Sequence, residues 1–160
     1  MADQQMVMYE EEFRQIATIC ERLTREANAK AVLLVDKNGQ YITSNGETGD
    51  LDTTSLASLA AGTNAATNGL AKLIGEKDFP NNFLEGEKYN LHFSIVAQRA
   101  ILVVMFDQRS SLGLVRLRVK RASEELANIF AAMLQKAQSQ AQGAPFGEIT
   151  DDDIDNLFSE

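Results

Sequence analysis

The side chains best suited to chemistry are few in this sequence and stand far apart. His92 is the only histidine and Cys20 the only cysteine among 160 residues. His92 has no Cys, Asp or Glu at the spacing of a metal site and falls on the polar side of a strand, so we expect an ordinary strand histidine. Cys20 falls on the apolar stripe of a helix, which favours a buried thiol over a nucleophile. No Ser-His-Asp or Cys-His set stands out, so the sequence predicts a protein without an active site of its own.

The sequence also carries no nucleotide-binding signature. The stretch from Gly69 to Gly75 lacks the Lys and Ser/Thr that must follow the glycines of a phosphate-binding loop. The formal charge of −8 argues against nucleic acid as the main partner, because phosphate binding requires a basic surface. We therefore expect no cofactor, no metal and no nucleic acid. The single cysteine is consistent with a reducing compartment, and neither a secretory signal nor a membrane span is visible, so we expect a cytoplasmic protein.

One helix is expected to organise the chain, and it runs from Asp52 to Gly75. Asp52 and the Thr and Ser residues after it are N-cap types, and Gly75 can take the left-handed conformation that ends a helix. One face repeats residues at steps of three and four and is expected to face the core: Leu56, Leu59, Thr63, Ala66, Leu70 and Leu73. The other face carries small residues in place of charges: Ala57, Ala61, Ala65 and Gly69. We predict that the small-residue face is an interface, and a central core helix in a monomer is the alternative.

The other elements follow from periodicity and turn signals. Helical spacing covers residues 9–27 and 111–137, and strand-like runs cover 31–35, 40–44, 83–87, 89–97 and 100–106. Tight turns are expected at 36–39 and 98–99, and a connector without regular structure at 77–82. The order α-β-β-α-β-β-β-α predicts an α/β (α+β) sandwich with a five-stranded antiparallel sheet. If the first and last helices cover one face, the organising helix leaves part of the other bare, and a two-fold dimer would complete that layer.

Two charged segments stand out in the last third of the chain. A solvated face and a docking patch are both open interpretations of the basic residues in the last helix: Arg116, Arg118, Lys120 and Arg121. Residues 1–138 are expected to form the domain, 139–147 a flexible linker and 148–160 an acidic amphipathic tail. Ile154, Leu157 and Phe158 would share one face of a short helix in that tail, so we expect the tail to order on a partner.

Four stretches of the sequence can be compared with a known protein family: the helix SLASLAAGTNAATNGLAKLIGE, the strand AILVVMFD, the segment SSLGLVRLRVKRASEEL and the acidic end DDDIDNLFSE. Together they resemble the roadblock/dynein light chain family, in particular its bacterial regulators of small GTPases. The resemblance covers most of the chain and implies a roadblock/longin-like fold and a homodimer whose sheet continues across the two-fold axis. It also implies a partner, a Ras-like small GTPase of the MglA type that docks on the paired central helices. Members of this kind stimulate GTP hydrolysis by the partner, which implies a role in cell polarity or motility and a concentration at a cell pole.

Two mechanisms of activation are open. An arginine finger accelerates hydrolysis by roughly 10³–10⁵-fold, and Arg99 and Arg109 are the plausible fingers, although neither belongs to the small-residue face. The resemblance implies the other route, in which the protein holds the switch loops of the partner and the tail is a second contact that modulates nucleotide exchange. The partner-binding residues that we predict are Ala57, Ala61, Asn64, Ala65, Asn68, Gly69, Lys72, Ile154, Leu157 and Phe158.

Two functions of other classes are the alternatives. A passive scaffold of the same fold would bind a GTPase, or a polar or cytoskeletal protein, without changing hydrolysis. A ligand-sensing module of the GAF or PAS kind ranks last, because the unbroken apolar stripes offer no convergent polar groups for a pocket.

Overall fold

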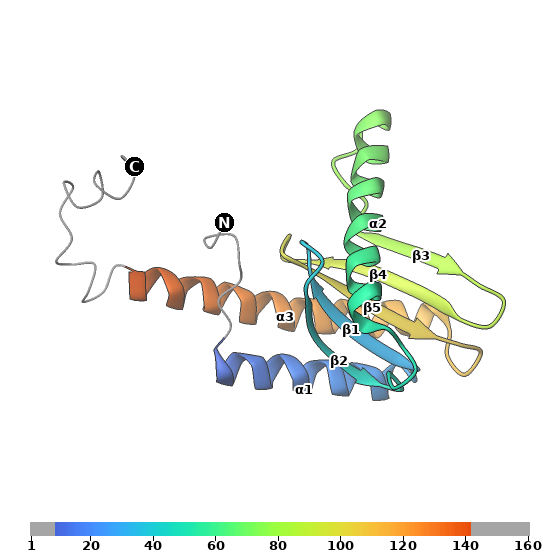
Figure 1. Cartoon of the computed structure of the whole chain (residues 1–160), viewed down its shortest axis with the longest axis horizontal. Coiled ribbons are helices and arrows are strands. Elements are labelled where there is room, and N and C mark those ends of the chain that lie inside the picture. The colour runs from blue at the N-terminus through green and yellow to red at the C-terminus, as the bar shows by residue number, and fades with distance from the viewer. Residues whose placement is uncertain (1–8, 142–160) are drawn as a thin grey trace.

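The structure is a computed structural model that describes residues 9–141 of the chain. Within this part the elements follow the predicted order: α1 (Glu10–Glu26), β1 (Ala31–Asp36), β2 (Tyr41–Gly46), α2 (Thr53–Ile74), β3 (Asn81–Glu85), β4 (Asn90–Val96), β5 (Ala100–Phe106) and α3 (Leu112–Ala141). The strands form one antiparallel sheet in the order β2-β1-β5-β4-β3, and helices lie on both of its faces (Figure 1). The predicted α+β sandwich with a five-stranded antiparallel sheet is confirmed.

The middle of the sheet is covered on both faces. Every residue of β1 and β5 is buried, which is typical of strands between two helical layers. On one face α1 and α3 pack together, and Ile16, Leu23 and Leu126 belong to the larger apolar core there. On the other face α2 packs alone, with Ala57 and Ala60 in the smaller core. The layer of α1 and α3 therefore covers more of the sheet than α2 does on the opposite face.

A tight turn connects the two strands in each of the hairpins β1–β2 and β4–β5. In the β1–β2 turn Gly39 has a φ of +97°, and its N–H donates to the carbonyl oxygen of Asp36 at 2.8 Å. Glycine suits this position because L side chains rarely adopt that φ, and the predicted turn is confirmed. In the β4–β5 turn the left-handed residues are Ala97 and Gln98, with φ of 55° and 57°. That turn centres on residues 97–98, slightly before the position expected from the sequence.

The structure corrects three expectations. The strand β3 begins at Asn81, inside the segment expected as an irregular connector, because pairing with β4 gives this segment a hydrogen-bonding partner. The helix α3 continues to Ala141, so residues 139–141 belong to it and not to the linker. His92 does not lie on a wet strand face: it is only 1% exposed, because α3 covers that side of β4.

Helix α2 is longer than the surface it covers. It has 22 residues, and its last turns project past the sheet in Figure 1. Its main contacts lie on β1, β2 and β5, so the outer part of this face, over β3 and β4, is left largely without a helix. The element order predicted such a bare region, and the structure places it beside the projecting half of α2.

Candidate functional site

Local sequence signals define both ends of α2. The side chain of Asp52 accepts hydrogen bonds from the hydroxyl of Ser55 at 2.7 Å and from its backbone N–H at 3.0 Å. These bonds lower the pKa of the Asp52 carboxyl because they stabilise its charged form. At the other end Gly75 has a φ of +81°, and the N–H of Glu76 donates to the carbonyl oxygen of Ala71 at 2.8 Å. Both ends were predicted, since a cap depends on its immediate neighbours.

The first small residues of α2 face the sheet, which reverses the orientation expected from the sequence. Ala57 and Ala60 are buried in the core between α2 and the strands. A Cβ added at Gly39 would lie 3.4 Å from the Cα of Ser58 and 3.6 Å from the Cβ of Ala61, so the helix backbone runs close above the β1–β2 turn. Such a close approach leaves room for alanine and not for leucine.

Three of the leucines that were assigned to the core point away from it. Leu59 is 68%, Leu70 58% and Leu73 83% exposed. We call the outward row at steps of three and four the leucine stripe: Leu59, Thr63, Ala66, Leu70 and Leu73. The length of α2 is a signal that could have revealed this exposure. Its 22 residues span about 33 Å, whereas the seven residues of a long strand span only about 23 Å, so part of the helix must extend past the sheet.

The predicted partner-binding residues of α2 divide by exposure. Ala57 belongs to the core, so its side chain offers no direct contact to a partner. Ala61, Asn64 and Asn68 are half-buried, whereas Ala65, Gly69 and Lys72 are exposed. A Cβ added at Gly69 would meet no atom within 4 Å, so this position is open to an approaching surface. The exposed and half-buried members form a small, polar flank beside the leucine stripe, and we call it the small-residue flank.

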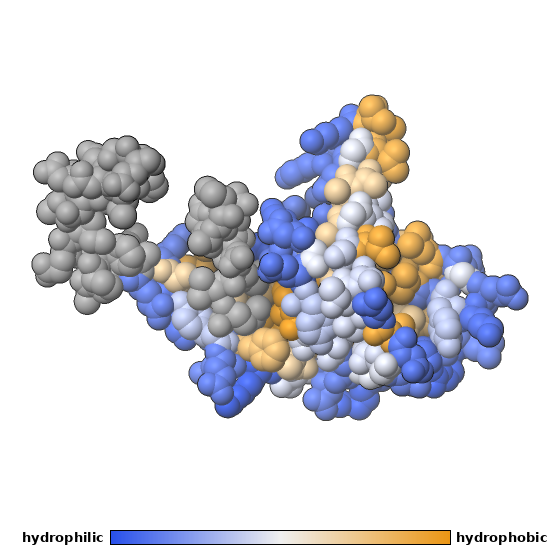
Figure 2. Space-filling model, in the orientation of Figure 1, coloured by the Kyte–Doolittle hydropathy of each residue, from blue (hydrophilic) through white to orange (hydrophobic). Residues whose placement is uncertain are grey.

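Apolar side chains continue from α2 onto the bare part of the sheet. Leu84 of β3 is exposed, and its cross-strand partner Leu91 of β4 is half-buried. Figure 2 shows apolar side chains at the projecting end of α2 and next to the helix over the sheet. A contiguous exposed apolar patch of this kind marks an interaction site more often than it marks ordinary surface.

The two arginines considered as fingers are held in turns outside this surface. Arg109 pairs with Asp107 at 3.1 Å and with Glu47 at 3.5 Å. Its bond to Asp107 lowers the pKa of that carboxyl. Arg99 is the half-buried last residue of the β4–β5 turn, and its carbonyl oxygen accepts the N–H of Lys37 at 3.0 Å. Neither arginine belongs to α2, as expected from the sequence.

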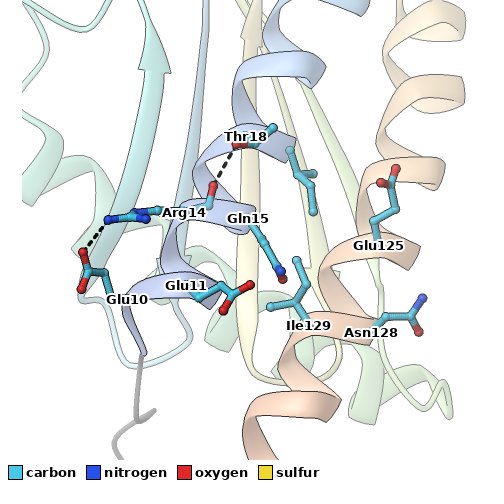
Figure 3. Close-up of a pocket in the computed structure, with 9 residues that line it drawn as sticks. Glu10, Glu11, Arg14, Gln15, Thr18, Glu125, Asn128 and Ile129 are labelled. Carbon is cyan, nitrogen blue, oxygen red and sulfur yellow. Dashed lines mark hydrogen bonds and ion pairs between the residues drawn. The ribbon is translucent and has the colours of Figure 1, made fainter.

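A groove separates α1 from α3, and most of its charged groups already have partners within the chain. Its volume is about 850 Å³, and Figure 3 shows Glu10, Arg14 and Glu125 among the side chains that line it. Arg14 pairs with Glu10 at 2.7 Å, and Glu125 pairs with Arg22 and with Arg121. Because these charges are matched within and between the two helices, the groove is explained by helix packing without a ligand.

The described residues place no reactive group on the α2 surface. Within residues 9–141 no cluster of three or more His, Cys, Asp or Glu side chains could hold a metal ion. Burial raises the pKa of the Cys20 thiol to about 12, so the thiol stays protonated at neutral pH. No helix in this part of the chain is long and apolar enough to cross a membrane. The predicted contacts Ile154, Leu157 and Phe158 lie outside the described residues.

The fold and the uncovered α2 can be compared with known proteins. A model of the Roadblock/LC7 domain matches residues 15–106. The chain is similar to the solved MglB of Myxococcus xanthus, with 63% identity, a TM-score of 0.76, and coverage of 79% of this chain and 96% of that one. It is also similar to the gliding protein MglB of Thermus thermophilus, with 34% identity, a TM-score of 0.75, and coverage of 80% and 97%.

A further solved structure, an MglB with a tetrameric arrangement, shares 33% identity and a TM-score of 0.75, with coverage of 81% of this chain and 97% of that one. These matches extend over nearly the whole of each solved chain. The family model alone spans more than half of the sequence. This chain therefore belongs to the Roadblock/LC7 domain family, and its fold is of the MglB type.

Proposed function

We propose that this protein binds a Ras-like small GTPase of the MglA type as a homodimer and stimulates GTP hydrolysis by that partner. The observation that carries the proposal is α2, which exposes a leucine stripe and a small-residue flank on one projecting helix. The likeness to MglB of Myxococcus xanthus, at 63% identity, supports the same family role. The protein has no active site of its own in this proposal and acts through the catalytic groups of the partner.

The leucine stripe is the surface for the second copy. Its steps of four and three residues are those of a helix seam that packs against another helix. Burying the exposed fractions of Leu59, Leu70 and Leu73 would contribute about 3–6 kcal/mol per protomer. Two such helices, related by a two-fold axis, would also cover the bare strands of each protomer. The outer edge of β3 pairs with no other described strand, so the sheet can continue there into the second copy.

The small-residue flank is the surface for the GTPase. Ala65 and Gly69 allow a close approach of the partner backbone, and Asn64, Asn68 and Lys72 can hydrogen-bond to its polar groups. Such a contact can hold switch loops in the catalytic arrangement without a residue inserted into the nucleotide site. Arg109 is already tied to Asp107 and Glu47, which favours this route over an arginine finger.

The acidic tail provides a second contact. In this proposal the roadblock-type domain extends to the end of α3 at Ala141, residues 142–147 form the linker and 148–160 the tail. Ile154, Leu157 and Phe158 would bind an apolar groove of the GTPase. The tail would modulate affinity or nucleotide exchange, while the α2 surface accelerates hydrolysis.

The cellular role would be control of polarity or motility by a cytoplasmic protein that concentrates at a pole.

The alternative function is a passive scaffold that uses the same α2 surface. A scaffold would bind the GTPase, or a polar or cytoskeletal protein, and leave the rate of hydrolysis unchanged. The alternative shares every contact described above, so only turnover separates the two functions.

The test is single-turnover GTP hydrolysis by the cognate GTPase, with and without this protein. We expect stimulation by the natural chain and its loss in Gly69→Arg and Ala65→Arg, because a long charged side chain blocks a close contact. Gly113→Arg is the matched control, since Gly113 is also an exposed helical glycine with no atom within 4 Å of an added Cβ. Full stimulation by a folded Gly69→Arg variant would remove the flank from the mechanism. Binding without stimulation by the natural chain would make it a scaffold.

A further inference from the structure

A second concave site lies between the first half of α3 and β4, on the sheet face opposite α2. Its volume is about 520 Å³, within the range of roughly 300–1,000 Å³ that small-molecule sites occupy. Strand β4 contributes His92 and Ser94, and α3 contributes Arg116, Lys120 and Ser123. These polar groups converge only because α3 crosses β4, so the sequence did not reveal them.

The site contains buried polar atoms that lack partners. His92 is 1% and Ser94 3% exposed. Neither ring nitrogen of His92 nor the hydroxyl of Ser94 or Ser123 makes a hydrogen bond to any residue between 9 and 141. A buried polar group without a partner costs about 1–3 kcal/mol. Apolar side chains could fill the same positions without that cost, so the retained polar groups call for a ligand that satisfies them.

The charges at the site point to an anion. Arg116 and Lys120 stand one helical turn apart, line the same site, and form no ion pair within the described part of the chain. Glu124, one turn further, is the only carboxylate among the lining residues. Burial, with the nearby Arg116, lowers the pKa of His92, so the imidazole is neutral at pH 7 and offers one donor and one acceptor.

The contrast with the other side of α3 strengthens this interpretation. There Arg121 pairs with Glu125 at 3.4 Å, and Arg22 of α1 joins the same carboxylate. Arg121 is therefore neutralised within the described fold, whereas Arg116 and Lys120 are not. Arg116 and Lys120 border the unpartnered hydroxyl and imidazole groups. Two neighbouring cations that form no ion pair repel each other, and a bound anion removes this cost.

We propose that the site between α3 and β4 binds a small organic anion, with a carboxylate or phosphate head group held by Arg116 and Lys120. Pro80 and Val119 supply apolar walls, so the ligand would carry a hydrophobic body next to its head group. His92, Ser94 and Ser123 would bond to the part of the ligand that enters deepest. The site and the α2 surface lie on opposite faces of the sheet, so this proposal does not depend on the GTPase.

The test uses His92 as a reporter, because a single histidine gives a single set of imidazole signals. The isotope-labelled full chain is titrated with phenyl phosphate, benzoate and neutral benzyl alcohol at constant pH and ionic strength, and the His92 ring resonances are followed by NMR. We expect a saturable shift with at least one of the two anions and none with the alcohol. Saturation by phenyl phosphate alone or by benzoate alone supports the site and identifies its head group.

Variants separate a specific site from general attraction of anions. Arg116→Gln and Lys120→Gln should each weaken binding at least about tenfold, the loss expected from one charge-assisted hydrogen bond. Arg121→Gln is the matched control on the same helix and should bind as the natural chain does. Ser123→Ala should lower the affinity severalfold with the charges unchanged. The proposal is overturned if neither anion saturates, if benzyl alcohol shifts the signal equally, or if Arg121→Gln weakens binding as much as Arg116→Gln.

Discussion

Truncating one leucine of the stripe tests the role of α2 in dimerisation. Leu73 is 83% exposed in the single chain, so Leu73→Ala removes almost no contact within the protomer. We expect the unfolding free energy of the monomer to change by less than about 0.5 kcal/mol, as for most surface substitutions. The same side chain would be buried in a two-fold helix pair, where each substitution is present twice.

The expected loss follows from the area that the leucine hides. Burying a leucine contributes about 1.5–3 kcal/mol, and most of this is lost on truncation to alanine. Counted for both copies, the dimer would lose about 2–5 kcal/mol. At about 1.4 kcal/mol per factor of ten, its dissociation constant would rise by about 30-fold to several thousand-fold.

Sedimentation equilibrium over a dilution series measures this constant directly. Leu117→Ala is the control, because Leu117 is likewise an exposed leucine, with 62% of its surface accessible, but lies on α3. We expect the control to dimerise as the natural chain does, and both variants to keep the helix content of the natural protein. An unchanged dissociation constant for Leu73→Ala, or an equal loss in Leu117→Ala, would refute the assignment of the leucine stripe to the dimer.

Three further predictions concern the arginines, the tail and the buried histidine. Arg99→Ala and Arg109→Ala should leave most of the GTPase stimulation intact in single-turnover assays, and a loss of several hundredfold in either would establish an arginine finger. Deleting residues 147–160 should weaken GTPase binding or alter nucleotide exchange, measured with a fluorescent nucleotide, and unchanged values for both would exclude the tail from the contact. The lowered pKa of His92 means that the unfolded chain binds a proton at a higher pH than the folded chain. The unfolding free energy should therefore fall as the pH drops below the ordinary histidine value of 6.5, and less so in His92→Gln. Identical pH profiles for the two proteins in denaturant titrations would contradict this.

The ends of α2 were predictable because they depend on neighbouring residues. Asp52 and Gly75 define α2 through hydrogen bonds that reach only a few positions along the chain. The apolar run of β5 likewise predicted a strand covered on both faces, and all seven of its residues are buried. The order of elements then predicted the layers, since few packings satisfy one sheet and its helices.

The direction in which α2 faces could not be predicted in the same way. A row of leucines has the same periodicity whether it packs on its own sheet or on a second chain. Here the close approach of the helix to Gly39 admits only small residues, and that approach is a property of the assembled sheet and helix. The two faces were therefore exchanged only in part: Ala57 joins the core and three leucines are exposed, whereas Ala65 and Gly69 are exposed as predicted.

The sequence by itself determined the elements, their order and the family of this protein, because these depend on local propensities, on caps and on a pattern that extends along the chain. The tertiary structure alone decided which surfaces remain open. Leu73 is exposed because the last turns of α2 extend past the sheet (Figure 1). His92 is buried because α3, which follows later in the sequence, crosses over β4. Exposure is set by what packs above a residue, and that neighbour can lie anywhere in the sequence.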